Sequence, residues 1–270
     1  MLLGKRPVVG VLHPGAMGAA LGAALKPVAG EVIWAAAERS DATSKRAELA
    51  DLVAVPDVAE LVARSDLVIS ICPPHAALDV AREVRAAARG ARPAAYLDAN
   101  AVAPTTVASI AELLGRERVV DGAVIGAPAW QRADTLLWLA GEPAKEVAAL
   151  FAASPFDARV LPGDLGSASA LKACFALQSK ALPTLWWTVA EAARRYGVAD
   201  AVRAELARDG VDLDAALAAF ARRAGGKAWR WSGEMDEVAA AMATVGLPAG
   251  FASAAAETYR RLTADGDGSA

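Results

Sequence analysis

The chain has 270 residues, enough for one large domain or two ordinary ones, and much of its 55% hydrophobic content is alanine. Its 28 Lys and Arg residues and 31 Asp and Glu residues are scattered along the chain, so we do not expect a nucleic-acid-binding protein. Two cysteines, Cys72 and Cys174, cannot build a disulfide framework and lack metal-ligand spacing, which predicts a cytoplasmic protein without a metal site.

The first 25 residues combine Lys5 and Arg6 with an apolar run, as a signal peptide does. Glycines and a proline interrupt that run, however, which favours a strand, a turn and a helix of a soluble domain. No stretch of the chain is long and apolar enough to predict a membrane span convincingly. We therefore expect no membrane partner.

Residues 1–162 alternate short buried strands with helices. The pattern predicts strands at 7–12, 31–36, 66–72, 95–98, 119–125 and 136–140, and helices at 58–64, 76–89 and 105–114 besides one after the first strand. Such alternation is typical of a Rossmann-type, doubly wound parallel sheet, so the fold class is α/β.

Residues 163–270 show no strand pattern and predict an all-helical second domain. A long helical run covers 166–196, where Pro183 can introduce a kink. Further helices are expected at 200–208, 212–223, 234–245 and 250–263, with a glycine-bounded loop before the third of these.

A glycine-rich turn follows the first strand and opens the first helix. It consists of His13, Pro14, Gly15, Ala16, Met17 and Gly18. The dinucleotide fingerprint G-x-G-x-x-G uses glycines for a tight turn, close approach to the pyrophosphate, and helix–strand packing. Here His13 replaces the first glycine, but the strand-turn-helix context still predicts a nicotinamide dinucleotide on this turn.

The end of the second strand bears on the choice between NAD and NADP. Glu38 there could bind the ribose 2′-hydroxyl of NAD, whereas Arg39 could accept the 2′-phosphate of NADP. Ser40 and Thr43 add hydroxyl donors nearby. We expect NADP in preference to NAD, although Glu38 would repel a phosphate unless it turns away.

Lys172 is the only charged residue between Leu165 and Ser179. Its helical neighbours three and four positions away are small or apolar. A lysine in that setting must extend to solvent, pair with an acid, or perform chemistry, because burying a lone charge is unfavourable. A catalytic lysine could donate a proton to a carbonyl oxygen or stabilise an alkoxide.

Four segments together resemble the β-hydroxyacid dehydrogenase superfamily, which includes the 6-phosphogluconate dehydrogenase-like proteins. Residues 9–18 resemble its opening I-G-x-I-G-x-G-x-M-G, and 98–104 resemble D-x-S-T-x-x-P. Residues 121–127 resemble D-A-P-V-S-G-G, and Gly163 to Gly166 followed by Lys172 resemble the segment around its catalytic lysine. Residues 227–235 further resemble a poorly characterised subgroup with a 6-phosphogluconate dehydrogenase-like C-terminal domain.

The resemblance implies that Lys172 is the general acid/base and that Asn100 takes the place of a substrate-binding serine. A turn asparagine is the alternative at that position. Ile125 and Gly126 stand where the family binds a carboxylate, with Ile125 a poorer anion ligand. The resemblance places Cys72, Pro73 and Pro74 at the nicotinamide ribose, although a buried thiol is the simpler interpretation of Cys72.

The family also forms dimers in which both subunits contribute to the cleft, so the resemblance implies a homodimer. Trp229, Trp231 and Glu234 could then supply an apolar wall and one polar group for substrate, although tryptophans more often pack in a core or a dimer contact. We expect Lys180, two turns beyond Lys172, to face solvent.

The sequence therefore predicts an NADP-dependent oxidoreductase that acts on a small carbonyl or alcohol. Imine reductases share the architecture that the resemblance implies, but they usually replace the lysine with Asp or Tyr. A non-catalytic dinucleotide-binding protein is a further alternative, because His13, Ile125 and Ala176 depart from the family's pattern.

Overall fold

The computed structural model describes residues 2–88, 94–131 and 134–267. It divides into two compact units, Met1–Lys172 and Ala173–Ala270. The boundary between these units lies inside helix α7 (Ser167–Ala176), ten residues after the change of sequence pattern at 162/163. The reason is that the beginning of α7 is hydrogen-bonded to the sheet: Ser169 donates to the buried Asp121 from both its backbone N–H and its hydroxyl.

The first unit is built on an eight-stranded sheet in the order β3-β2-β1-β4-β5-β6-β7-β8. The strands are β1 (Val8–Val11), β2 (Glu31–Ala35), β3 (Val53–Val55), β4 (Leu67–Ser70), β5 (Ala95–Asp98), β6 (Val119–Ile125), β7 (Leu136–Ala140) and β8 (Asp157–Val160). The strands β1 to β6 pair in parallel, which confirms the α/β fold class. The sequence patterns did not predict β3 and β8, since one is only three residues long and the other is mostly exposed.

β7 runs antiparallel to β6, contrary to the expectation of a wholly parallel sheet. The segment between Ile125 and Leu136 is too short to hold the helical crossover that parallel neighbours require. β8 then pairs in parallel with β7 after helix α6 (Ala144–Leu150), so the sheet is parallel over its first six strands and mixed at one end.

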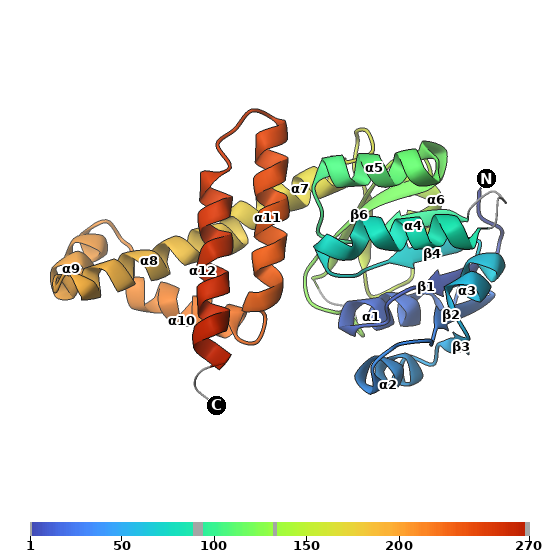
Figure 1. Ribbon diagram of the computed structural model, residues 1–270, viewed down its shortest axis with the longest axis horizontal. Coiled ribbons are helices and arrows are strands. Elements are labelled where there is room, and N and C mark those ends of the chain that lie inside the picture. The colour runs from blue at the N-terminus through green and yellow to red at the C-terminus, as the bar shows by residue number, and fades with distance from the viewer. Residues whose placement is uncertain (1, 89–93, 132–133, 268–270) are drawn as a thin grey trace. The chain divides into compact units, whose positions relative to one another are not determined.

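Helices cover both faces of this sheet (Figure 1). One face packs against α1 (Ala16–Leu25), α2 (Asp41–Leu49) and α6, and its core is rich in alanine. The other face packs against α3 (Val58–Arg64), α4 (Ala77–Ala87) and α5 (Pro104–Leu114). Because both faces are buried, the central strands read as continuous apolar runs, which made them recognisable in the sequence.

The second unit is helical, as expected. After α7 come a π-helical turn (Leu177–Ala181), α8 (Leu182–Arg195), α9 (Ala199–Arg208), α10 (Leu213–Ala224), α11 (Ala228–Thr244) and α12 (Gly250–Asp267), of which α11 and α12 lie side by side (Figure 1). Pro183 lies in the first turn of α8, directly after the π-helical turn. The helical run is thus interrupted by the π-helical turn just before Pro183. The proline itself is tolerated because the first turn of a helix does not need its N–H. Within the described ranges, no helix is long and apolar enough to cross a membrane.

The segment expected to be a loop before residue 234 is helical, because α11 begins at Ala228. Trp231 is buried and its ring packs edge-on against Tyr259, 5.5 Å between ring centres, whereas Trp229 is 58% exposed. Residues two positions apart on a helix point in different directions, so these tryptophans do not form one wall.

Glu234 and Lys180 form a largely buried ion pair in this helical unit, contrary to the expectation that Lys180 faces solvent. The Lys180 ammonium also lies 5.7 Å from the centre of the Trp231 ring. Arg230 contacts the second oxygen of Glu234 at 3.3 Å. Glu234 thus forms ion pairs with two cations of its own unit. Because the Lys180–Glu234 pair is largely buried, removing either charge would leave the other without compensation and destabilise the fold.

Changing Glu234→Gln is expected to lower the free energy of unfolding by about 2 kcal/mol, because the Lys180 ammonium would keep its burial and lose its counter-charge. Urea denaturation followed by circular dichroism measures this difference. Asp236→Asn is the matched control, since Asp236 pairs with Arg260 at the exposed surface of the same helix and should change stability by less than about 0.5 kcal/mol. Equal effects of the two variants would contradict a structural role for the buried pair.

Candidate cofactor and catalytic site

The turn between β1 and α1 presents backbone donors at an open helix start. The Gly15 N–H donates to the His13 carbonyl at 2.8 Å, and α1 has no side-chain cap and no acid in its first turn. A Cβ built on Gly15 would meet no atom within 4 Å, so a ligand can approach the backbone there. Pro14 is buried, and Ala16 and Met17 begin α1. These features suit the pyrophosphate of a dinucleotide.

Gly18 has a different reason for being glycine. A Cβ on Gly18 would lie 2.2 Å from the His13 carbonyl oxygen and 3.0 Å from the Ile71 side chain. The helix therefore packs too closely on the turn for any larger residue, which is the role of the third glycine of the fingerprint.

His13 and Arg39 come together from the ends of β1 and β2. Burial and the Arg39 guanidinium lower the pKa of His13 to about 4, so its imidazole is neutral at pH 7. Among the described residues, neither His13 Nδ1 nor Arg39 Nε has a hydrogen-bond partner, although both atoms are buried. Two buried nitrogen atoms without partners fit a phosphate ligand in this corner.

Arg39 lies between a residue with an unusual backbone conformation, Glu38, and the N-cap of α2, Ser40. Glu38 adopts a positive φ of 58°, a left-handed conformation that is uncommon outside glycine. The Ser40 hydroxyl caps α2 by accepting the Thr43 N–H at 3.3 Å, and the two hydroxyls lie 3.1 Å apart. Ser40 and Thr43 thus already contribute to the start of α2, whereas Arg39 Nε lacks a partner there.

A buried polar cluster joins the carboxyl ends of β4 and β5. The Asn100 amide nitrogen donates to Asp98 at 2.9 Å and to the Ser70 hydroxyl at 3.1 Å. Its amide oxygen accepts the Cys72 N–H at 2.6 Å. Both hydrogens of the amide are therefore engaged within the protein, so its geometry suits positioning the two strand ends better than donating to a substrate.

Two buried carboxyl groups lie on neighbouring strands, because Asp98 of β5 is in register with Asp121 of β6. Burial raises the pKa of Asp98 to about 7, opposed by its hydrogen bonds from Asn100. Burial also raises the pKa of Asp121, opposed by hydrogen bonds from Ser169 and from backbone groups at the start of α7. Asp121 therefore anchors α7 to the sheet.

Lys172 follows Ser169 by about one helical turn on α7. Its positive charge lowers the pKa of Asp98, which associates the lysine with the buried carboxyl pair. Lys172 is half-buried. Asn100 links Cys72 to Asp98 by hydrogen bonds, and the Lys172 charge acts on Asp98. Asp98 ends β5, at the edge of a parallel sheet where ligands of this architecture bind.

The remaining expected site residues differ in burial, in backbone conformation and in the unit to which they belong. Partial burial raises the pKa of Cys72 to about 12, which agrees with an unreactive, half-buried thiol. Pro73 and Pro74 lead into α4, and Ile125 ends β6 half-exposed. Gly126 has a φ of 137° and packs against Thr135, where a Cβ would come within 2.5 Å of the hydroxyl. Trp229, Trp231 and Glu234 belong to the second unit.

Asp98 and Asp121 lie in the sequence motifs but were not among the expected site residues, and neither were Ser70 and Ser169. An acid that ends a buried strand is a signal that could have identified Asp98. The link from Asp121 to Ser169 spans 48 positions and could not be recognised without the fold.

Asp98→Asn is expected to flatten the pH dependence of stability. The folded protein keeps the Asp98 carboxyl protonated to about pH 7, whereas an unfolded chain releases that proton near pH 4, so stability falls as pH rises between these values. The wild type should lose about 2 kcal/mol more than Asp98→Asn between pH 5 and pH 8. Urea denaturation across pH measures this, with Asp79→Asn on the exposed face of α4 as the control. Parallel curves for wild type and Asp98→Asn would contradict the assignment.

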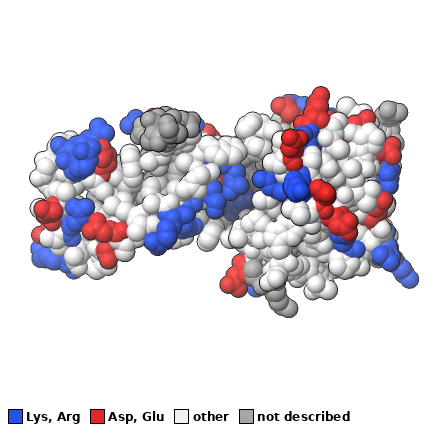
Figure 2. Space-filling view, turned by 90° about the horizontal axis from the view of Figure 1, so that it is seen from below, with Lys and Arg blue, Asp and Glu red and all other residues white. Residues whose placement is uncertain are grey.

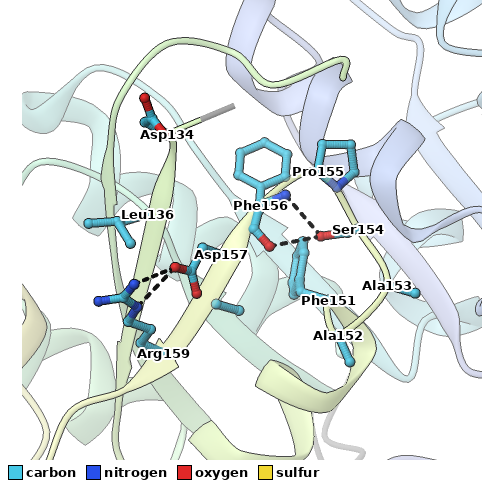
Figure 3. A pocket seen from close by; sticks show the side chains of 11 residues that line it. Asp134, Leu136, Phe151, Ala152, Ala153, Ser154, Pro155, Phe156, Asp157 and Arg159 are labelled. Carbon is cyan, nitrogen blue, oxygen red and sulfur yellow. Dashed lines mark hydrogen bonds and ion pairs between the residues drawn. The ribbon is translucent and has the colours of Figure 1, made fainter. Parts of the chain in front are cut away.

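A hollow of about 790 Å³ lies elsewhere, at the β8 end of the sheet (Figure 3). Two of its polar groups are paired: Arg159 donates two hydrogen bonds to one Asp157 oxygen at 2.6 and 3.0 Å, and the Ser154 hydroxyl bonds to Phe156 backbone groups. We assign it no part in the site. On the face drawn in Figure 2, Lys and Arg lie among Asp and Glu toward both ends of the view, whereas Lys and Arg predominate in its middle.

A family described as a domain of unknown function, DUF1932, matches residues 193–262. An uncharacterized 28.5 kDa protein of Methanothermus fervidus, named for the 5′ region of its 7S RNA, is 31% identical over 163 residues. That match covers 60% of this chain and 61% of the relative, so it spans less than two thirds of the relative's length.

Solved structures match the chain over nearly its whole length. The conserved protein MTH1747, of unknown function and described as structurally similar to 3-hydroxyacid dehydrogenases, is 25% identical with a TM-score of 0.68, covering 94% of this chain and 96% of its own. The 3-hydroxyisobutyrate dehydrogenase of Mycobacterium tuberculosis, described with L-serine, is 19% identical with a TM-score of 0.71, covering 96% and 94%. The reductive aminase of Aspergillus terreus, described with NADPH, cyclohexanone and allyl amine, is 17% identical with a TM-score of 0.56, covering 97% and 95%.

These matches confirm the resemblance that the four sequence segments carried. They extend through the sheet, the dinucleotide turn and the helical unit alike. The chain therefore has the fold of the 3-hydroxyacid dehydrogenase superfamily and carries a DUF1932 domain near its C-terminal end.

Proposed function

We propose that this protein is an NADP-dependent oxidoreductase that interconverts a small carbonyl compound and its alcohol, with Lys172 as the general acid/base. The observation that carries the proposal is the position of Lys172 on α7, three residues after Ser169, which hydrogen-bonds the buried Asp121 in register with Asp98 at the carboxyl edge of the sheet. The dinucleotide turn after β1 opens at the same edge, because β1 and β4 are parallel neighbours.

The cofactor fits the residues of the first unit. The backbone donors of the turn from His13 to Gly18 would hold the pyrophosphate at the start of α1. Arg39 would bind the 2′-phosphate, which supports NADP over NAD, and Glu38 would have to point away from it. The bound nicotinamide would supply or accept the hydride.

Lys172 would manage the proton of the reaction. In the reducing direction its ammonium donates a proton to the substrate oxygen as negative charge develops there, and in the oxidising direction the neutral amine accepts it. Asp121 and Ser169 hold the start of α7 and thereby orient the lysine. Asn100 fixes the ends of β4 and β5, and the Lys172 charge lowers the pKa of the buried Asp98.

A two-part experiment tests the proposal. Fluorescence titration should give tighter binding of NADPH than of NADH, and a substrate panel should show NADPH oxidation with aldehydes, ketones or keto acids. Turnover of cyclic imines alone would favour the imine reductase alternative. Tight NADPH binding without oxidation by any panel member would favour a non-catalytic dinucleotide-binding protein.

We also propose a cytoplasmic homodimer. The support is that α8 exposes large apolar side chains, Leu182 at 40% and Leu185 at 50%, and that Cys72 and Cys174 are free thiols. Sedimentation equilibrium should then give twice the chain mass of 27.6 kDa, whereas a mass of one chain at micromolar concentration would contradict the dimer.

A further inference from the structure

The substitution of His13 for the first glycine of the fingerprint is a feature that the proposed reaction does not use. The imidazole lies close enough to Arg39 for the guanidinium charge to lower its pKa. A protonated His13 beside Arg39 would be unfavourable in the free protein, and an anion bound near both groups would offset that cost.

Both groups also have buried nitrogen atoms without partners among the described residues, His13 Nδ1 and Arg39 Nε. Folded proteins rarely leave such atoms unpaired. The two atoms come from different strands, and a single acceptor with several oxygens could pair with both. A phosphate group meets that requirement, because it combines negative charge with three acceptor oxygens.

We propose that His13 and Arg39 together bind the 2′-phosphate of the dinucleotide, and that His13 takes up a proton when the phosphate enters. The inference rests on the proposed function only in taking NADP as the ligand. It assigns His13 to phosphate recognition and makes cofactor affinity depend on pH.

The charges around His13 set the direction of this dependence. Arg39 stays positive throughout, and the segment after it carries the acids Glu38 and Asp41 and the bases Lys45 and Arg46. Burial and Arg39 cause the low pKa of about 4 in the free protein. A phosphate beside the imidazole favours its charged form and raises that pKa, so between the free and bound values binding consumes one proton and tightens as pH falls.

Isothermal titration calorimetry with 2′,5′-ADP tests the inference, since this ligand carries the 2′-phosphate without the nicotinamide. Titrations in two phosphate-free buffers of different ionisation enthalpy give the protons taken up per ligand bound. The wild type should take up more protons at pH 6.5 than His13→Asn, a variant of similar size that does not titrate. It should also bind about tenfold more tightly than His13→Asn at pH 6.5, with a smaller difference at pH 8.

The variant comparison removes the ligand's own titration, because the second pKa of a phosphate lies near 6 and is common to both proteins. 5′-AMP, which lacks the 2′-phosphate, should bind the wild type and His13→Asn equally and with the same proton exchange, since only its own 5′-phosphate titrates. His13→Gln provides a second variant if His13→Asn does not fold.

Two unfavourable outcomes are distinguishable. If the wild type prefers 2′,5′-ADP over 5′-AMP but the variants show the same proton uptake and affinity, the role of His13 is overturned while NADP recognition stands. If the wild type binds 2′,5′-ADP no more tightly than 5′-AMP, both the 2′-phosphate site and the proposed preference for NADP are wrong.

Discussion

Replacing Lys172 with methionine is expected to lower kcat by about 10²- to 10⁴-fold on a substrate found in the panel, with NADPH affinity nearly unchanged. The loss follows from removing the group that transfers the proton, since methionine keeps the length of the side chain but has no titratable nitrogen. Pre-steady-state and steady-state NADPH fluorescence measure the rate, and equilibrium titration measures cofactor binding.

Lys145→Met is the matched control, because Lys145 lies exposed on α6 in the same unit. It should leave both kcat and NADPH affinity within about twofold of the wild type. Turnover that survives Lys172→Met would remove the lysine from the chemistry, although the protein would still be an oxidoreductase.

A second large effect is expected at Gly18. Gly18→Ala places a methyl group 2.2 Å from the His13 carbonyl oxygen, and neither the turn nor the start of α1 can accommodate it without moving backbone. We expect a loss of stability of about 3 kcal/mol and no measurable NADPH binding. Thermal denaturation and fluorescence titration measure the two effects separately.

Gly15→Ala is the informative comparison, because its methyl group would meet no protein atom within 4 Å. This variant should be as stable as the wild type to within about 1 kcal/mol, yet bind NADPH at least about tenfold more weakly if the pyrophosphate occupies that space. A Gly15→Ala protein with full cofactor affinity would show that the ligand does not approach the turn there.

The strand, turn and helix around His13 to Gly18 were predictable from sequence because the pattern is local. A strand, a glycine-rich turn and a helix are contiguous in the sequence. The glycines are required by the tight turn and by close backbone packing, and these requirements hold wherever the motif occurs. The helical character of the second half was predictable for a similar reason, but the helix boundaries were not. Trp229 and Trp231 belong to α11 rather than to a loop. Trp231 is buried against Tyr259, whereas Trp229 is exposed, and this difference depends on the packing of α11.

The polar cluster could not be predicted in the same way, because its members meet only through the sheet. Asp98 and Asp121 are 23 positions apart and become neighbours through the parallel register of β5 and β6. Asn100 looked like a substrate ligand in sequence, but the folded chain directs its amide to Ser70 and Asp98. Whether a side chain has a hydrogen-bond donor left for a ligand depends on which strands lie beside it in the folded sheet.

The sequence by itself determined the α/β fold class, the dinucleotide turn and the isolation of Lys172 in an apolar helix, since contiguous patterns and periodicity carry these features. Only the tertiary structure decided the mixed end of the sheet, the buried Asp98 that accompanies Lys172, and the meeting of His13 with Arg39. The physical reason is that burial and charge proximity change a group's pKa and hydrogen-bonding capacity, and both arise from contacts between distant segments.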